Sequence, residues 1–486
     1  MDRRKQVYVH TIGCQMNVYD SGRIARMATS MNYQQTQTME EADLIIVNTC
    51  SVREKACQKA FSFMGRMAGL KRKRPEILLG VAGCMAQQEG EKLLGRPDGI
   101  DFVLGPGAID RLPDILEKVL TQQVPAADLF MPENMPFPES EGEGADPLIP
   151  QKNRVSGFVT IMRGCDNFCS YCIVPHVRGR ESSRRPEKIV GEIKRLVESG
   201  AREITLLGQN VNSYGKKDGS PSFAEMLWQV NEIKGLERIR FTTSHPKDIS
   251  SQLIDCFRDM DKLCHHIHLP VQSGSNAVLK KMNRKYTRER YLETIARLKD
   301  ACPDIAVTSD MIVGFPGETD EDFGDTLLLL EQVQFDGLFA FSYSDRPGTP
   351  AAGFPPEIKI SEEIKKARLK RLLDAQEVYT TRKNRALVGS CQPVLTEGFS
   401  KKQASNNDCA DIQWTGRTSS NKIVNFTRCH THKTGDSHGT PQGIQPGQTV
   451  RVTIKKALSH SLWGEEMAES AGAGNQPARN EEKHAD

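Results

Sequence analysis

The stretch FVTIMRGCDNFCSYCIVPHVRGRE at residues 158–181 decides how the central part of the chain folds. Its first five residues predict a buried strand, and Cys165, Cys169 and Cys172 follow soon after it. Three thiolates with the spacing C-x3-C-x2-C on one short loop can bind three irons of a cubane 4Fe-4S cluster and leave the fourth iron open. A structural zinc ion is the alternative. Zinc prefers four ligands, often from paired C-x2-C units, and here His176 would have to be the fourth.

Further strands are predicted after this stretch, with amphipathic helices such as 186–200 and 287–301 between them. The strands are EITLLG (203–208), RIRFTT (238–243), HHIHLPV (265–271), AVTSDMIVG (306–314) and LFAFSYS (338–344). These βα units are too few for a closed eight-fold barrel, so we expect a partial (β/α)6 barrel with an open side. Barrel active sites lie at the C-terminal ends of the strands, and the cysteine loop follows the first strand. The position of the cysteine loop therefore favours an iron–sulfur cluster over a zinc ion.

Residues 1–120 alternate apolar strands with helical stretches and predict an open parallel α/β sheet. The strands are 7–13, 43–49, 77–83 and 102–105, and Cys14, Cys50 and Cys84 follow the ends of the first three. Side chains just beyond the carboxyl ends of parallel strands converge on one crevice. We therefore expect these three thiols to meet and to form a second metal site. The alternative is three separate buried residues, and Cys57 is excluded because it falls into the helix after Cys50.

The remaining segments complete a three-domain organisation. Residues 121–157 are rich in Pro, Glu and Gly and predict a linker between residues 1–120 and a barrel domain at 158–387. That domain ends in a long basic helix at 360–387. Short strands separated by turns at 388–464 predict a small all-β barrel with a loop insertion at 428–447, and residues 465–486 predict a disordered tail.

Composition places the chain among soluble globular proteins, with 38% hydrophobic and 26% charged residues in a length of 486. The N-terminus lacks the apolar region of a signal peptide, and no stretch approaches the ~18 apolar residues of a membrane span. We therefore expect a cytoplasmic protein without membrane association. In a reducing compartment its 13 cysteines are better suited to metal binding than to disulfides.

The net charge of +3 hides an uneven distribution. Residues 388–464 contain nine Lys or Arg against four Asp or Glu, a net of +5, which indicates a nucleic-acid partner. The candidate phosphate-binding side chains are Lys401, Lys402, Arg417, Lys422, Arg428, Arg451, Lys455 and Lys456. Trp414, Phe426 and Trp463 are candidates for stacking on bases, although a place in the core is an equal alternative for each.

C-x3-C-x2-C on a β/α barrel is the signature of the radical S-adenosylmethionine superfamily, and RGCDNFCSYCIVPHVRGRE resembles its methylthiotransferase branch. The resemblance runs from Val7 to Glu465. It implies a 4Fe-4S cluster on the central cysteines that cleaves S-adenosylmethionine into a 5′-deoxyadenosyl radical. It also implies an auxiliary 4Fe-4S cluster on Cys14, Cys50 and Cys84 that binds or delivers the inserted sulfur. EGFSKK, GRTSSNKIVNF and VTIKKALSHSLWGE resemble the TRAM domain, an RNA-binding barrel.

Polar and glycine residues after other barrel strands are candidate contacts to S-adenosylmethionine, with ordinary turn chemistry as the alternative. They lie in LLGQNVNSYG, HLPVQSGS and SDMIVGFPGET, which also resemble the branch, and they are Gln209, Asn210, Gln272, Ser273 and Gly314. No residue is predicted to act as a general acid or base.

GCQMNVYDS and FSYSDRPGTPAA resemble most closely the members that act on tRNA carrying N6-isopentenyladenosine at position 37. The implied reaction abstracts a hydrogen atom from carbon 2 of this adenine, and the carbon radical attacks a sulfur that a second S-adenosylmethionine has methylated. The expected partners are this tRNA and an electron donor protein. The target base is expected to turn out of the stack of its loop. The expected oligomeric state is a monomer. Action on threonylcarbamoyladenosine tRNA, action on a ribosomal protein aspartate, and a non-catalytic iron–sulfur RNA-binding protein remain alternatives.

Overall fold

The computed structural model describes residues 4–51, 54–131, 155–217, 219–400, 412–428 and 444–467. These residues form two compact units. The first is Met1–Lys383 with Ser419–Asn421, and the second is Asn384–Thr418 with Lys422–Asp486.

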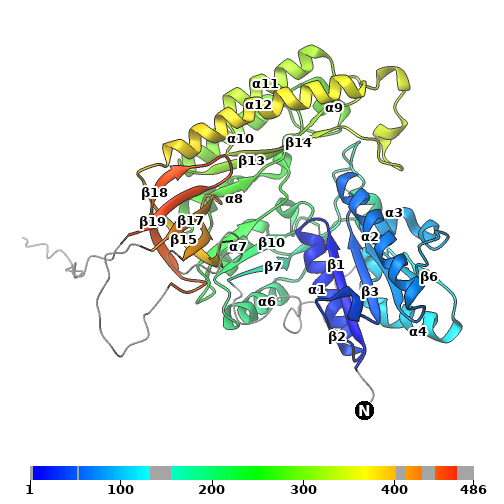
Figure 1. Cartoon of the computed structure of the whole chain (residues 1–486). Helices are drawn as coiled ribbons and strands as arrows, with labels where there is room; N and C mark the ends of the chain where they lie inside the picture. Colours follow the sequence, from blue (N-terminus) through cyan, green and yellow to red (C-terminus); the bar gives the residue numbers. More distant parts are fainter. Residues whose placement is uncertain are drawn as a thin grey trace, which may run out of the picture. The chain divides into compact units, whose positions relative to one another are not determined.

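The N-terminal part of the first unit is a parallel sheet with the strand order β2-β1-β3-β4-β5-β6 (Figure 1). The strands are β1 (Gln6–Ile12), β2 (Gln34–Gln35), β3 (Leu44–Thr49), β4 (Leu78–Gly83), β5 (Phe102–Leu104) and β6 (Ala126–Asp128). Helices cover both faces. Leu44 and Ile46 pack with α1 (Gln15–Ser30) and α4 (Leu112–Gln122), whereas Ile45 and Val47 pack with α2 (Glu54–Lys73) and α3 (Cys84–Glu89). A strand buried on both faces needs a continuous apolar run, which explains the sequence LIIV at residues 44–47 of β3. The parallel strand order confirms the predicted open α/β sheet.

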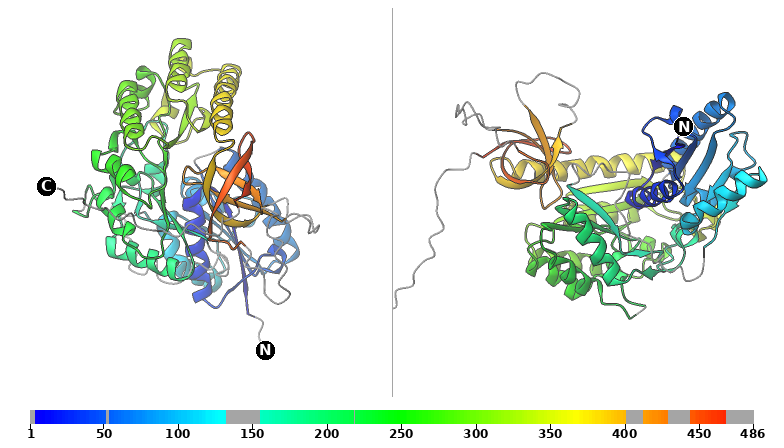
Figure 2. Two further views of the ribbon diagram at one scale, coloured as in Figure 1. Left: turned by 90° about the vertical axis from the view of Figure 1, so that its left-hand side faces the viewer. Right: turned by 90° about the horizontal axis from the view of Figure 1, so that it is seen from below.

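The second part of this unit is the predicted six-stranded partial barrel (Figure 2). Its strands are β7 (Ser156–Thr160), β10 (Glu203–Leu207), β11 (Arg238–Phe241), β12 (His266–His268), β13 (Ala306–Val313) and β14 (Gly337–Ser342). They form two three-stranded parallel sheets, β7-β10-β11 and β12-β13-β14, and the bridge between Ile239 and Leu263 joins β11 to the segment before β12. The surrounding helices are α6 (Pro186–Glu198), α7 (Phe223–Asn231), α8 (Ser251–Asp259), α10 (Arg288–Ala301), α11 (Asp320–Val333) and α12 (Glu362–Ala386).

The second unit is a closed barrel with the strand order β15-β16-β17-β19-β18, as predicted for an all-β domain. The strands are β15 (Cys391–Phe399), β16 (Gln413–Arg417), β17 (Ile423–Thr427), β18 (Thr449–Ala457) and β19 (Leu462–Glu466). Trp414 and Phe426 belong to its core, so they are unavailable for base stacking, whereas the ring of Phe399 is exposed beside Trp414. Ion pairs also occupy part of the predicted basic face, because Arg417, Arg428 and Lys455 pair with glutamates.

Three predicted boundaries need correction. The linker 121–157 begins too early, because α4 continues to Gln122 and β6 pairs with β5; residues 132–154 lie outside the described residues. The tail 465–486 also begins too early, because β19 ends at Glu466; residues 468–486 lie outside the described residues. Most of the predicted loop insertion lies outside them as well, but Ile444 packs into the barrel core.

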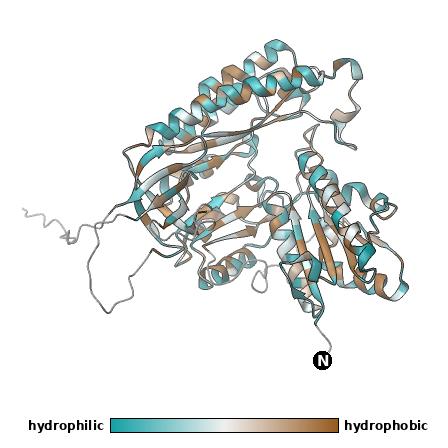
Figure 3. Ribbon diagram, in the orientation of Figure 1, coloured by the Kyte–Doolittle hydropathy of each residue, from teal (hydrophilic) through white to brown (hydrophobic). Residues whose placement is uncertain are grey.

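Hydrophobic residues concentrate on the strands, and the helices alternate hydrophilic and hydrophobic sides (Figure 3). No helix in the described part of the chain is long and apolar enough to cross a membrane.

Candidate iron–sulfur and cofactor-binding site

The structure brings Cys14, Cys50 and Cys84 together at one edge of the N-terminal sheet. Ile12, Thr49 and Gly83 are aligned across β1, β3 and β4, and the cysteines follow these residues closely. The side chains of Cys14 and Cys50 are hydrogen-bonded, and Cys84 is close enough to interact electrostatically with Cys14. Strand register therefore gathers three thiols that are distant in the sequence.

Asn17 and its neighbours hold this edge in place. Its Oδ1 accepts a hydrogen bond from the Cys14 N–H at 3.3 Å, and its Nδ2 donates to the Asn48 Oδ1 and to the Thr49 carbonyl, both at 3.1 Å. Gly83 has a φ of +93°, and a Cβ there would lie 2.4 Å from the Asn48 Oδ1. The backbone before Cys84 therefore requires glycine.

Cys165, Cys169 and Cys172 lie on the loop between β8 (Met162–Arg163) and α5 (Val174–Arg178). The Cys172 N–H donates to the Cys169 carbonyl at 2.9 Å, and the Cys165 N–H donates to the Gly179 carbonyl at 3.3 Å. Cys169 interacts electrostatically with both other thiols. The loop is thus folded so that its three thiols lie near one another.

Each cysteine group has one buried arginine hydrogen-bonded to one of its sulfurs. The Nε of Arg178 lies 3.2 Å from the Cys84 Sγ, and its other end pairs with Asp20 at 2.7 Å. A guanidinium nitrogen of Arg284 lies 3.4 Å from the Cys169 Sγ. The other side-chain hydrogen bonds of Arg284 go to oxygens of Tyr171, Tyr286 and Pro270, and no carboxylate of the described residues pairs with it.

The thiol pKa values of the cysteines differ from one another. Burial raises the pKa of Cys165 to about 11 and that of Cys172 to about 12. The hydrogen bond with Cys50, helped by Arg178, lowers the pKa of Cys14 to about 6. Burial raises the pKa of Cys84 as well, so the N-terminal group contains both a lowered and a raised thiol pKa. Metal binding displaces the proton from each of these thiols.

These residues fit iron–sulfur clusters better than single metal ions. Among the described residues, the one set of three metal-ligating atoms within 4.8 Å of one another is His265, Cys302 and Asp304, which contains no cysteine of either group. A zinc ion with Zn–S bonds of about 2.3 Å would hold its sulfurs about 3.8 Å apart. His176, the fourth ligand in the zinc alternative, is exposed. An anionic thiolate-bound cluster would also give the buried cation of Arg284 a negatively charged partner.

The predicted cofactor residues after β10 take two different roles. The Gln209 Oε1 accepts a hydrogen bond from the Gly164 N–H at 2.6 Å and so supports the cysteine loop. The Asn210 Nδ2 donates to Asp248 at 2.8 Å, while its buried Oδ1 has no hydrogen-bond partner within the described part of the chain. Asn210 therefore offers an unsatisfied acceptor to a ligand.

Gln272 and Ser273 serve the barrel itself. Gln272 has a φ of +75°, and its carbonyl accepts from the Ile312 N–H at 2.9 Å. The fully buried Ser273 hydroxyl lies 3.4 Å from the Thr326 hydroxyl of α11 and accepts from the Ser275 N–H. These contacts turn the chain after β12, and cofactor contact by either residue stays a prediction.

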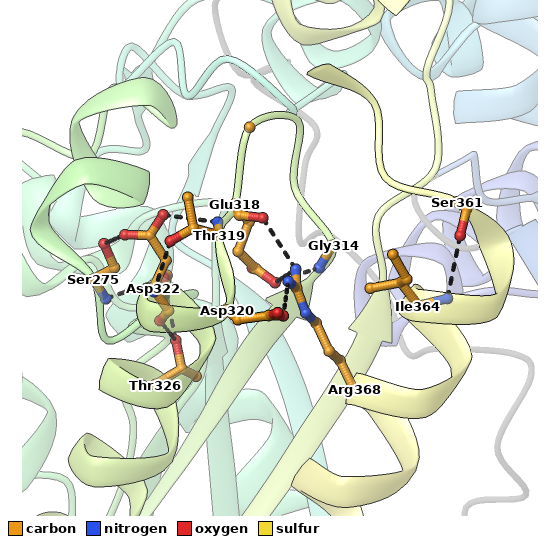
Figure 4. Close-up of polar contacts among 12 residues, drawn as sticks. Ser275, Gly314, Glu318, Thr319, Asp320, Asp322, Thr326, Ser361, Ile364 and Arg368 are labelled. Atoms are coloured by element: carbon orange, nitrogen blue, oxygen red, sulfur yellow. Dashed lines mark hydrogen bonds and ion pairs between the residues drawn. The ribbon is translucent and has the colours of Figure 1, made fainter. Parts of the chain in front are cut away.

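Gly314 lies in a turn that α12 holds in place (Figure 4). Its N–H donates to the Glu318 Oε1 at 3.0 Å, and the same oxygen accepts from Arg368 at 2.6 Å. Burial raises the pKa of Glu318, and the bonds from Gly314 and Arg368 oppose that effect. A Cβ at residue 314 would lie 2.4 Å from the Lys365 Cγ, so close packing already explains the glycine, and contact with a ligand stays a prediction.

Sequence reasoning missed Ser244 and His245, which follow β11. Both are buried, and the Ser244 Oγ and the His245 Nε2 have no hydrogen-bond partner among the residues that the structure describes. Burial and the charge of Arg284 hold the pKa of His245 well below its ordinary value, and its Nδ1 accepts from the Lys247 N–H at 3.3 Å. The ring is therefore neutral with its proton on Nε2, ready to donate to a ligand. The signal available in the sequence was the polar run after the strand at 238–243.

Comparison with known proteins adds independent information. Residues 159–330 match the Radical SAM superfamily, and residues 6–105 match the Uncharacterized protein family UPF0004. The chain is 51% identical over 472 residues to the tRNA-2-methylthio-N(6)-dimethylallyladenosine synthase of Desulfosudis oleivorans, covering 97% of this chain and 98% of the relative. It is 50% identical over 467 residues to the protein of the same name from Syntrophus aciditrophicus, covering 96% and 95%.

Solved structures show a related fold at low sequence identity. The radical S-adenosylmethionine methyltransferase TsrM from Kitasatospora setae, with cobalamin and a [4Fe-4S] cluster bound, has a TM-score of 0.52 at 14% identity, covering 72% of this chain and 74% of TsrM. This likeness concerns the fold alone, whereas the sequence matches extend along nearly the whole chain. The chain therefore belongs to the tRNA-2-methylthio-N(6)-dimethylallyladenosine synthase family of the radical SAM superfamily.

Proposed function

We propose that this protein is a tRNA methylthiotransferase that places a methylthio group on carbon 2 of N6-isopentenyladenosine at position 37. The relatives that share half of its residues over their full length carry this activity in their names. The observation that carries the proposal is the presence of two three-cysteine groups in one compact unit, joined through Arg178. Radical formation alone needs one such group, so the second favours sulfur insertion.

When bound, a 4Fe-4S cluster on Cys165, Cys169 and Cys172 supplies an electron for cleavage of S-adenosylmethionine, and one on Cys14, Cys50 and Cys84 supplies the sulfur site. The protein itself orients the reactants. Asn210, Ser244 and His245 offer unsatisfied polar atoms near the C-terminal ends of β10 and β11, where a barrel binds its ligand. Arg178 connects the segment after the central cysteines to the sheet edge that holds Cys84.

The cellular setting follows from the same proposal. A tRNA substrate places the enzyme in the cytoplasm, and reductive cleavage of S-adenosylmethionine requires an electron donor protein. One chain contains both cysteine groups, so a monomer suffices for the reaction.

Turnover with purified components tests this function. The cluster-loaded protein, S-adenosylmethionine and a reductant are incubated with tRNA carrying N6-isopentenyladenosine, and the nucleosides are analysed by mass spectrometry. We expect a 2-methylthio product and 5′-deoxyadenosine. Formation of 5′-deoxyadenosine without the product, or product from threonylcarbamoyladenosine tRNA instead, would reject the proposed substrate. Absence of both products would favour a non-catalytic RNA-binding protein.

A further inference from the structure

A groove with a cavity volume of about 650 Å³ lies on the N-terminal sheet, between β1 and α2. Its lining residues come from these two elements: His10, Ile12, Lys55, Gln58, Lys59, Ser62, Phe63 and Arg66. Pairing with β2 occupies β1 at Gln6 and Val7, and no strand of the described residues lies beside the later part of β1 on that side. This open edge leaves room for the groove.

The groove carries a concentrated positive charge. Lys55, Lys59 and Arg66 are exposed along one side of α2, at spacings that suit a single helix face. No ion pair joins any of them to an acidic residue within the described part of the chain. Elsewhere on this domain the basic residues are often paired, as Lys71 is with Asp101 and Arg74 with Asp43. These three cations are therefore available to an anionic ligand.

A pair of aromatic rings, one from β1 and one from α2, joins the two walls of the groove. The rings of His10 and Phe63 are stacked with centroids 4.0 Å apart and an interplanar angle of 11°. The guanidinium of Arg66 lies 4.7 Å from the centre of the Phe63 ring. Burial and the nearby Arg66 lower the pKa of His10, so its ring is neutral at pH 7. A flat neutral ring beside free cations suits a ligand with a planar base and a phosphate.

The groove adjoins the sheet edge that carries the N-terminal cysteines. His10 and Ile12 belong to β1, which ends just before Cys14, and α2 begins shortly after Cys50. Both walls of the groove thus lead directly to cysteines of the same group.

We infer that this groove binds single-stranded RNA of the substrate, with Lys55, Lys59 and Arg66 on phosphates and His10 beside an unpaired base. The inference rests on the proposed function and adds a tRNA contact on the N-terminal domain. S-adenosylmethionine is disfavoured as the occupant because its sulfonium and ammonium groups give it a net positive charge, which the three cations repel. A loop nucleotide next to the modified adenine has the required charge and shape.

A charge-removal experiment on the full-length cluster-loaded protein tests this inference. The variant Lys55→Ala/Lys59→Ala/Arg66→Ala is compared with Arg72→Ala/Lys73→Ala/Lys92→Ala, which removes the same charge from exposed positions of the same domain outside the groove. Affinity for tRNA carrying N6-isopentenyladenosine is measured by fluorescence anisotropy at several KCl concentrations. Iron content and melting temperature verify that both variants are folded and loaded.

We expect the groove variant to bind this tRNA at least about tenfold more weakly than the wild type at about 100 mM KCl. The slope of log Kd against log KCl concentration should be smaller by about two. The control should change affinity by less than about threefold. Equal affinity and salt dependence in both variants would overturn the inference, as would loss of S-adenosylmethionine binding with unchanged tRNA affinity. If the wild type methylthiolates tRNA in either case, the proposed function stands and only the groove assignment fails.

Discussion

The Nε of Arg178 lies 3.2 Å from the Sγ of Cys84, although 94 residues separate them in the chain. Arg178 ends the helix that follows the central cysteines, and Cys84 begins the helix after β4. The same guanidinium pairs with the buried Asp20 at 2.7 Å. Ile173 and Val177 also pack against Cys84. The segment after one cysteine group is therefore part of the packing around the other.

Replacing Arg178 by Met should destabilise the cluster-free protein by about 3 kcal/mol, because Asp20 loses the nearer of its two buried arginine partners and keeps only Arg23, at 3.8 Å. The same change should lower iron retention at the N-terminal group, because the hydrogen bond to Cys84 is lost. Urea unfolding and iron analysis measure the two effects. Arg180→Met is the matched control, since Arg180 is exposed and its partner Asp166 keeps a second ion pair with Lys217, so the loss should be less than about 1 kcal/mol. Equal stability of the two variants would contradict the role of Arg178.

The two cysteine groups should be separable by mutation. Cys14→Ala and Cys165→Ala should each reduce the iron content from about eight to about four per chain. Cys165→Ala should abolish 5′-deoxyadenosine formation, whereas Cys14→Ala should retain it and lose methylthiolation.

Cys57→Ala is the control for this pair, because Cys57 lies near Cys50 but points its thiol toward the Cys50 carbonyl at 3.6 Å. It should keep about eight irons. Loss of about four irons from Cys57→Ala would reassign the N-terminal group.

Arg284 should tune the central cluster. Arg284→Met removes a buried positive charge that donates to the Cys169 Sγ, so the more negative reduced cluster is destabilised more than the oxidised one. The reduction potential should fall by about 40 mV, the equivalent of about 1 kcal/mol for a one-electron couple. Redox titration followed by electron paramagnetic resonance measures it. Arg288→Met, which removes an arginine paired with Asp325, should leave the potential unchanged. A rise in potential for Arg284→Met would contradict the proposed hydrogen bond.

Asp248 should make stability depend on pH. Burial alone would raise the pKa of Asp248, but hydrogen bonds from Lys216 and Asn210 outweigh burial and lower the pKa. A carboxyl group whose pKa is lower in the folded state stabilises the protein above its unfolded pKa of about 3.9, and that stabilisation is lost as pH falls through the folded pKa. Asp248→Asn should therefore cost about 1–2 kcal/mol at pH 7 and progressively less below pH 4.

Urea unfolding of the cluster-free protein at pH 7, 5 and 3.5 measures this dependence. Asp255→Asn is the control because about half of the Asp255 side chain, 48%, is exposed and Asp255 pairs only with Arg258 among the described residues. A cost for Asp248→Asn that is independent of pH would show that the charge of Asp248 plays no part.

The sequence predicts those features that depend on short-range pattern. Fully buried strands such as LIIV leave continuous apolar runs, and a parallel sheet places the residues after its strands at one edge. This is why Cys14, Cys50 and Cys84 were expected to meet. β6 was missed because Ala126–Asp128 is too short to leave a periodic signal.

Contacts between distant side chains carry no such pattern. Arg178 and Arg284 are ordinary basic residues in the sequence, and their cysteine partners are 94 and 115 residues away. The sequence also does not show that Lys365 packs against Gly314, although this packing already accounts for the glycine. Trp414 faces the barrel core because of the strand pairing around it, which composition alone does not determine.

Methylthiolation of N6-isopentenyladenosine is tested most simply in cells that lack this protein, by mass spectrometry of the nucleosides in their tRNA. The same cells are analysed for the modification of threonylcarbamoyladenosine and of ribosomal protein aspartates. We expect N6-isopentenyladenosine to accumulate without its 2-methylthio group. The wild-type gene should restore the group, whereas Cys14→Ala and Cys165→Ala should not. An unchanged level of 2-methylthio-N6-isopentenyladenosine, or a defect confined to one of the other two substrates, would contradict this expectation.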